Sequence, residues 1–368
     1  MLFNQLNITA FAITLLVSLA LVLTQRWHGR FSMDSMAGVQ KMHTLPTPRV
    51  GGVAIVLGLL VAYLQAKANV QALLGPMLLA STPAFAAGLL EDISKKAGVL
   101  TRLLATLCSG LLAWYLTGVA MQDTGFPLID GPLAYLPLAV LFTAFAVGGV
   151  ANAVNIIDGF NGLAAGTVAI MLGAMGLIAL QVNDHAVAGL CFAIAAVALG
   201  FGAINWPFGK LFLGDGGAYL LGFLVGWVAV LLPMRHLQIN AWATLLVCAY
   251  PVLEVAFSVR RRRKRLGHHP GQPDKAHLHH FIHRRLLPRL GVGRGTALRN
   301  GFTSPFCWLY AAIPAAWAVM FAQSTPMLVL GLVFVMVLYS ALYARLTQFG
   351  WCFRALTIRR PAFTVRRR

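Results

Sequence analysis

The chain has 368 residues, of which 59% are hydrophobic and only 11% are charged, with 29 Lys and Arg against 10 Asp and Glu. This composition excludes an ordinary soluble globular domain, in which about a quarter of the residues are charged. The formal net charge of +19 would also suit a nucleic-acid-binding protein. It is better explained by membrane topology and by attraction to anionic lipid headgroups, so we expect no nucleic-acid partner. The five cysteines have no close spacing and indicate neither a disulfide framework nor a zinc site.

Apolar segments long enough to cross a hydrocarbon core recur along almost the whole chain. Eleven such spans are predicted, near residues 8–24, 50–65, 72–90, 103–121, 132–151, 162–180, 186–204, 216–234, 241–259, 303–322 and 326–344. No Lys or Arg precedes the first span and no clear cleavage site follows it, so we expect a retained anchor there. The sequence therefore predicts an all-α, polytopic integral membrane protein forming one domain, residues 1–368.

Lys and Arg fall almost entirely on one side of this topology. One face holds 27 of the 29, in the segments 25–49, 91–102, 152–161, 205–215, 260–302 and 345–368, while the other keeps only Lys67 and Arg235. The positive-inside rule makes the rich face cytoplasmic. We therefore expect a periplasmic N-terminus and a cytoplasmic C-terminus, with a basic tail at 345–368.

Four of the ten acidic residues lie where apolar spans end. They are Glu91, Asp92, Asp158 and Asp215, and the predicted topology puts all four on the cytoplasmic face. A carboxylate beside hydrocarbon is costly and rare, so several at one depth indicate a functional site.

The third cytoplasmic loop is the most informative. Its polar residues Asn152, Asn155, Asp158 and Asn161 recur every three positions, so the first three drift slowly around one face of a helical turn. Amides and a carboxylate so placed suit a polar ligand or a hydrated metal. Helix capping would explain one such residue but poorly explains four.

The fourth loop, which contains Phe212 and Asp215, opens directly into a span. Asp215 could be only a helix N-cap. A glycine-flanked helix N-terminus is equally a natural cradle for phosphate or metal-phosphate. Phe212 is a candidate stacking platform for a base, although simple packing would also account for it.

In the first two loops, basic and acidic residues stand close together. Lys41, His43 and Arg49 would face anionic groups, or would only form a basic loop with a turn. The adjacent acids Glu91 and Asp92 can ligate a divalent cation and its phosphates, or pair with nearby lysines at a solvated helix end.

The fifth loop carries imidazoles at His277, His279, His280 and His283. Their spacing could bind zinc, but no cysteine accompanies them and zinc would leave the acids unexplained. Contact with phosphate fits better, and a passive surface is the remaining interpretation. Glu254, inside the ninth span, is expected only to pair with Arg260 or Arg261.

Together, four motifs resemble the polyprenyl-phosphate N-acetylhexosamine-1-phosphate transferases. The motifs are KMHTLPTPRVGG (41–52), NAVNIIDGFNGLAAG (152–166), FLGDGGAYLLG (212–222) and HLHH (277–280). The resemblance implies ten or eleven membrane helices around a cytoplasmic site in the bacterial inner membrane. It further implies transfer from a UDP-HexNAc to undecaprenyl phosphate, giving undecaprenyl-diphospho-HexNAc and UMP.

Such a reaction starts a cell-envelope glycan, for example O-antigen, and depends on Mg²⁺, with Mn²⁺ as a substitute. Two phosphate-bearing reactants repel one another, and a divalent cation with basic side chains offsets that repulsion. Membrane lipids are then surrounding partners, and a homodimer is compatible with the resemblance.

The resemblance also implies roles for individual residues. Asp215 would be a metal ligand, and Asn155 would help to hold metal and diphosphate. Asp158 would lie near the nucleotide, with Phe212 against the uracil. Glu91 and Asp92 would deprotonate or orient the lipid phosphate. His279 and His280 would contact phosphates as catalytic residues, together with Glu91, Asp92 and Asp158. The further residues expected to bind substrate are Lys41, His43, Arg49, Asn152, Asn161 and His277.

Two departures from the family pattern are relevant. Glu91 takes the first place of a pair that is usually Asp-Asp, and Asn161 stands where Asp is common.

The motifs at 46–52 and 277–280 look more like the GlcNAc-1-phosphate transferases than the muramoyl-pentapeptide branch. Direct attack by the lipid phosphate is favoured over a covalent phosphoryl-enzyme. The alternatives from other classes are a secondary transporter, with ionisable residues near the midplane of inverted repeats, and a lipid-binding scaffold.

Overall fold

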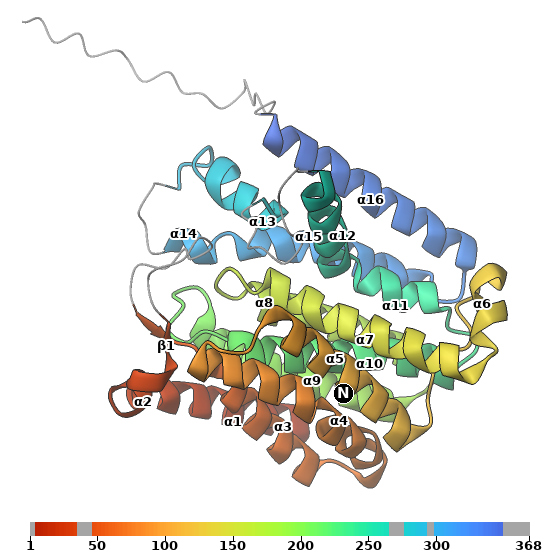
Figure 1. Ribbon diagram of the computed structural model, residues 1–368, viewed down its shortest axis with the longest axis horizontal. Coiled ribbons are helices and arrows are strands. Elements are labelled where there is room, and N and C mark those ends of the chain that lie inside the picture. The colour runs from red at the N-terminus through yellow and green to blue at the C-terminus, as the bar shows by residue number, and fades with distance from the viewer. Residues whose placement is uncertain (1–3, 35–45, 265–275, 293–297, 349–368) are drawn as a thin grey trace, which may run out of the picture.

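The computed structural model describes residues 4–34, 46–264, 276–292 and 298–348, and nearly all of these are helical (Figure 1). The first half comprises α1 (Gln5–Leu23), α2 (Gln25–Ser32), β1 (Met33–Asp34), β2 (Thr47–Pro48), α3 (Gly51–Gln65), α4 (Ala68–Ser94), α5 (Val99–Thr117), α6 (Pro127–Leu133), α7 (Leu136–Ile157) and α8 (Leu163–Gln181). The second half comprises α9 (His185–Asn205), α10 (Gly214–Arg235), α11 (Ala241–Val247), α12 (Ala249–Lys264), α13 (Leu278–Phe281), η1 (Ile282–Leu286), α14 (Leu298–Gly301), α15 (Ser304–Met320) and α16 (Thr325–Thr347).

The predicted spans coincide with helices, and the multi-pass, all-α architecture is confirmed. Within the described residues, nine helical segments are long and apolar enough to cross a membrane, and α3 is a shorter apolar helix. The predicted ninth span is not one straight helix, because α11 and α12 meet at Cys248 with a bend of 76°. Pro251 explains the break, since proline lacks the N–H that would bond four residues back and disfavours a helical conformation in the residue before it.

Helix α10 is the central helix of the bundle. In its most apolar stretch 89% of the residues are buried, against 22% in α1 and in α16. It packs against α7, α4, α3 and α8. A helix that is apolar all round is expected in such an interior position.

Glycines bring the start of α10 close to α3 and α4. A Cβ added to Gly88 would lie 2.5 Å from the backbone nitrogen of Gly216, and one added to Gly52 would lie 2.5 Å from that of Gly217. Small residues allow membrane helices to approach at backbone distance. As a result, the residues of α4 one turn beyond Gly88 lie next to the first turn of α10.

The segments that carry the sequence motifs gather at one end of the bundle. Helices α2, α13 and α14 and the strand pair lie there, on the left in Figure 1, whereas α6 lies at the other end. Strands β1 and β2 are antiparallel, with Asp34 opposite Thr47. The fourth loop is tied to this region by backbone bonds, since Phe212 donates to Pro48 O (2.8 Å) and accepts from Gly51 N (2.9 Å).

Candidate functional site

The start of α10 is capped by a carboxylate from another helix. Asp92, at the end of α4, accepts hydrogen bonds from the backbone N–H groups of Asp215 (to Oδ1) and Gly216 (to Oδ2), both at 2.9 Å. The residue at the N-cap position, Leu213, provides no side-chain cap. A negative charge here satisfies two orphan donors and interacts favourably with the helix dipole. Asp215 is therefore not the N-cap, and its own carboxylate is available to other side chains.

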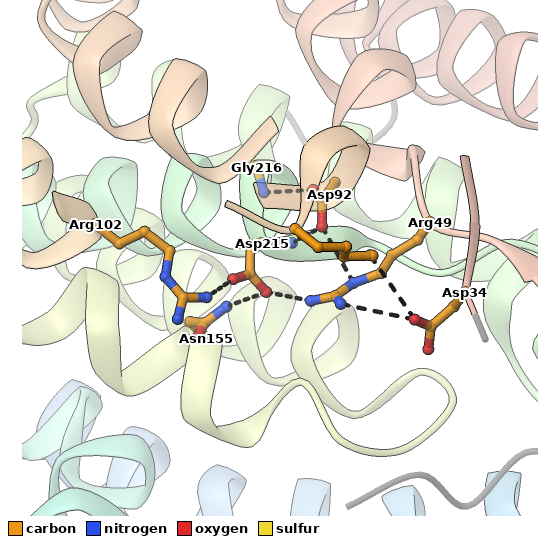
Figure 2. A network of polar contacts seen from close by, with 8 residues as sticks. Asp34, Arg49, Asp92, Arg102, Asn155, Asp215 and Gly216 are labelled. Carbon is orange, nitrogen blue, oxygen red and sulfur yellow. Dashed lines mark hydrogen bonds and ion pairs between the residues drawn. The ribbon is translucent and has the colours of Figure 1, made fainter. Parts of the chain in front are cut away.

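The Asp215 carboxylate lies between two arginines and an amide (Figure 2). Arg49 bonds Oδ1 and Arg102 bonds Oδ2, while Asn155 Nδ2 donates to Oδ1 at 3.2 Å. Arg49 also reaches Asp92, with 3.1 Å between Nε and Oδ1. The side chains around this buried carboxylate of α10 thus come from four separate parts of the chain, namely the residue after β2, α4, α5 and α7.

Further charges surround this core. Asp34 on β1 lies 3.9 Å from both Arg49 Nη1 and Lys95 Nζ. Burial would lower the pKa of Arg49, but Asp215, Asp92 and Asp34 raise it overall, so the guanidinium stays charged.

Asp158 follows the last residue of α7 and is half-buried beside this network. Burial raises its pKa to about 7, with Arg49 opposing the shift and the carboxylates of Asp215 and Asp92 adding to it. A carboxyl group that titrates near neutral pH in a cluster of charges is typical of functional sites. Asp158 is therefore coupled electrostatically to Arg49, Asp215 and Asp92.

Two of the predicted amides are engaged in contacts within the protein. The third loop is helical to Ile157, and Asn152 Nδ2 bonds Thr106 Oγ1 (2.9 Å) and Gly148 O (2.8 Å). Asn161 Nδ2 donates to Pro207 O at 2.9 Å and so holds the third loop to the fourth. These hydrogen bonds give both side-chain amides a partner within the protein, so no ligand is needed to explain why they are there.

Four further residues were predicted for the site from the first, second and fourth loops: Glu91, Phe212, Lys41 and His43. Glu91 is half-buried and is coupled electrostatically to Lys95 and Arg102. Phe212 is half-buried between the first and fourth loops. Lys41 and His43 lie outside the described residues.

Two of the fifth-loop histidines, His277 and His279, contact Glu254, which lies outside the acidic cluster. His277 Nδ1 lies 3.0 Å from Glu254 Oε2, and His279 Nδ1 lies 3.6 Å from Oε1. Glu254 was expected to pair with Arg260 or Arg261; the structure shows it with the imidazoles, because His277 and the Leu278 N–H at the start of α13 hydrogen-bond its buried carboxylate. The Phe160 ring packs against His279 and His280, with 5.5 Å between ring centroids in each pair.

Three of the residues in these contacts were not assigned to the site from sequence. Arg102 and Asp34 give no local signal of their partners, which lie far away in the chain. Glu254 did give one, since an acid inside an apolar span needs a partner and four histidines follow it.

The donor set around Asp215 suits a hard cation more than zinc. No group of three His, Cys, Asp or Glu side chains within the described ranges is arranged to hold a metal ion. Zinc normally takes at least three such ligands, whereas Mg²⁺ is commonly held by one or two carboxylates together with substrate phosphates. Asp215 and the Asn155 amide match the second pattern.

This arrangement defines a multi-pass membrane protein with a charged site at the ends of its helices. The sequence model of glycosyl transferase family 4 matches residues 74–233, which contain Asp92, Arg102, Asn155 and Asp215, so this part of the chain is similar to that family.

Named relatives of the chain come from several bacteria. The chain is 27% identical to the undecaprenyl-phosphate alpha-N-acetylglucosaminyl 1-phosphate transferase of Yersinia pestis, over 75% of this chain and 72% of the relative. It is 25% identical to the probable undecaprenyl-phosphate N-acetylglucosaminyl 1-phosphate transferase of Bacillus subtilis, over 92% of each. A third relative is the decaprenyl-phosphate N-acetylglucosaminephosphotransferase of Mycolicibacterium smegmatis, at 29% identity over 72% of this chain and 74% of the relative.

Proposed function

We propose that the protein transfers HexNAc-1-phosphate from a UDP-HexNAc to undecaprenyl phosphate. A lipid-phosphate oxygen forms a bond to the sugar-bearing phosphorus of the donor, the bond from that phosphorus to the bridging oxygen breaks, and UMP leaves. The products are undecaprenyl-diphospho-HexNAc and UMP. The names of the relatives support this reaction, and GlcNAc is the sugar that they favour.

The observation that carries the proposal is the position of Asp215 between Arg49, Arg102 and Asn155 at the ends of the helices. Such a site would lie at headgroup depth, where a lipid phosphate and a water-soluble nucleotide can meet. Guanidinium groups are well suited to phosphate oxygens because they bind them in a bidentate manner. A transporter would instead hold its ionisable groups near the bilayer midplane.

Mg²⁺ is the metal we assign to the site, held by Asp215 and Asn155 with phosphates of the substrate. When bound, it would neutralise the developing charge on the transferred phosphoryl group. Three cations are coupled electrostatically to five carboxylates, the cations being Arg49, Lys95 and Arg102 and the carboxylates Asp34, Glu91, Asp92, Asp158 and Asp215.

We assign different roles to the two adjacent acids. Both oxygens of Asp92 accept backbone hydrogen bonds, and Oδ1 also faces Arg49. A carboxylate so occupied is suited to hold α10 and Arg49 in place and is a poor nucleophile. Glu91 is the acid left to orient the lipid phosphate, and direct attack by that phosphate is the simpler route.

The site would face the cytoplasm of a bacterial inner membrane, where the donor nucleotide is made, and the product would start a cell-envelope glycan. Asp158 would lie near the nucleotide and Phe212 against its uracil. His279 and His280 would lie near phosphate, on the same side as the Asp158 turn.

The test is UMP release by purified protein in detergent with undecaprenyl phosphate and a panel of UDP-GlcNAc, UDP-GalNAc and 6-deoxy-HexNAc donors. The proposal expects release from at least one donor that requires both the lipid phosphate and Mg²⁺. Release that is independent of the lipid would contradict it. Exchange of labelled UMP into the donor without lipid would instead demand a covalent phosphoryl-enzyme.

A further inference from the structure

Glu254 is a buried carboxylate that contacts the fifth loop from inside the bundle. It lies in α12, just beyond the bend at Cys248, and is 1% exposed. Besides the two imidazoles, it accepts a hydrogen bond from the backbone N–H of Leu278 at 3.1 Å. A buried charge is tolerated only where donors surround it, and here His277 and the Leu278 N–H of the HLHH segment face the carboxylate together with Tyr339 on α16.

The carboxylate determines which nitrogen of each imidazole carries a proton. An ionised carboxylate only accepts hydrogen bonds, so His277 Nδ1, 3.0 Å from Glu254 Oε2, carries a proton. The same carboxylate lies 3.6 Å from His279 Nδ1 and favours the proton on that nitrogen through its charge. His279 Nε2 then carries a lone pair. Among the described residues this buried atom has no hydrogen-bond partner.

His279 Nε2 faces the turn that follows α7. It lies 3.7 Å from the position that a Cβ on Gly159 would occupy, so the absence of a side chain there leaves room next to the nitrogen. Gly159 adjoins Asp158, which is coupled electrostatically to Arg49 and Asp215. The unpartnered nitrogen therefore borders the charged network around Asp215.

Several titratable or charged groups surround the His279 ring. Tyr250 OH lies 3.4 Å from Nδ1 and itself bonds Cys307 on α15. Burial lowers the pKa of His279, and Glu254 opposes that shift. The groups that face the ring are Glu254 and Tyr250 on α12, His277 and His280 beside it in the fifth loop, Arg284 on η1 and the Asp158 turn.

We propose that Glu254 is a positioning residue that holds His279 with Nε2 directed at the phosphate of the lipid acceptor, and that His279 is the base that takes the proton of that phosphate. A phosphate monoester loses its second proton near pH 6, so part of the acceptor arrives protonated. The proton passes from a phosphate oxygen to Nε2, and no other bond changes. The imidazolium that forms is paired with Glu254 on one side and the phosphate on the other.

This inference rests on the proposed function and is tested by the pH dependence of UMP release. Glu254→Gln keeps the size of the side chain but removes its charge, so the imidazolium is less stable. We expect kcat to fall at least about 10-fold and the acidic limb of the pH profile to move down by about one pH unit, with the KM for the donor little changed. Glu254→Asp keeps the charge and should keep the wild-type pH profile at a lower rate.

A matched control is Asp184→Asn. Asp184 is also a buried carboxylate that bonds a histidine, His236 at 2.8 Å, but it caps the start of α9 next to the end of α10, at the other end of the bundle. Its loss should not move the pH profile.

A double-mutant cycle covers the case in which Glu254→Gln folds poorly. If Glu254 acts through His279, the rate of Glu254→Asp/His279→Asn should equal that of His279→Asn alone. Additive losses, or a Glu254→Gln enzyme whose acidic limb stays at the wild-type pH, would overturn the inference. Absence of UMP release by the wild type would instead overturn the proposed function.

Discussion

Asp92 and Asp215 are separated by 123 residues, yet the carboxylate of the first accepts the backbone N–H of the second at 2.9 Å. This contact holds α4 and α10 together at the site and leaves the Asp215 side chain directed toward Arg49 and Arg102. Asp92 therefore has a structural role in holding the helices, whereas Asp215 directs its side chain into the site. Each can be tested separately.

Asp92→Asn should reduce stability and activity together. The amide can accept only one of the two backbone hydrogen bonds and places a donor at the positive end of α10. We expect a loss of about 1–2 kcal/mol in stability and a large loss of activity. Thermal unfolding in detergent and UMP release measure the two effects. Glu91→Gln is the comparison, because it should lower activity without changing the unfolding temperature. Equal unfolding temperatures for Asp92→Asn and the wild type would argue against the capping role.

Gly214→Ala should disrupt the same contact from the other side. Gly214 has φ +77°, and a Cβ there would lie 2.5 Å from Asp92 Oδ2. The left-handed conformation costs about 1–2 kcal/mol for a residue with a side chain, and displacement of Asp92 adds to that. Gly149→Ala on α7, where a Cβ meets nothing within 4 Å, is the control and should unfold at the wild-type temperature. A Gly214→Ala protein as stable and active as that control would refute the arrangement.

Arg102→Lys tests the arginine that sequence analysis did not assign. Lysine keeps the charge but loses the planar fork that bonds Asp215 Oδ2, so we expect kcat/KM to fall about 10-fold or more. Arg235→Lys is a matched control, because Arg235 Nε also bonds a buried carboxylate, Asp184 at 2.9 Å, at the opposite end of the bundle. The two variants should differ in the steady-state kinetics of UMP release. Similar small effects in both would mean that Arg102 is not part of the site.

Asp158 should make substrate-free stability depend on pH near neutrality. Its pKa of about 7 lies above the ordinary value of 3.8, so between these pH values the folded protein holds more protons than the unfolded chain. Stability then falls as pH rises through this window. Asp158→Asn should show a smaller drop in unfolding temperature between pH 6 and pH 8.5 than the wild type, whereas exposed Asp123→Asn should behave like the wild type. An unchanged drop in Asp158→Asn would show that this carboxyl is not the cause.

The positions of the helices could be read from the sequence because length and apolarity alone decide them. Even the bend at Cys248 had a local signal in Pro251. The side-chain pairings could not be read, since Asp92 with Asp215 and Arg102 with Asp215 are contacts between distant segments. The three-residue spacing of Asn152 and Asn155 also did not reveal that one amide bonds Thr106 on α5 while the other bonds Asp215.

The most direct test of the account is Asp215→Asn. The amide keeps the shape of the side chain, and the cap from Asp92 to the backbone remains, so the protein should still fold. Loss of the ion pairs with Arg49 and Arg102 should lower its unfolding temperature. UMP release from a UDP-HexNAc with undecaprenyl phosphate and Mg²⁺ should fall by about 1,000-fold or more, as expected when a group that stabilises charge in the transition state is removed. A folded Asp215→Asn protein that releases UMP at a rate within a few-fold of the wild type would contradict the assignment of the site.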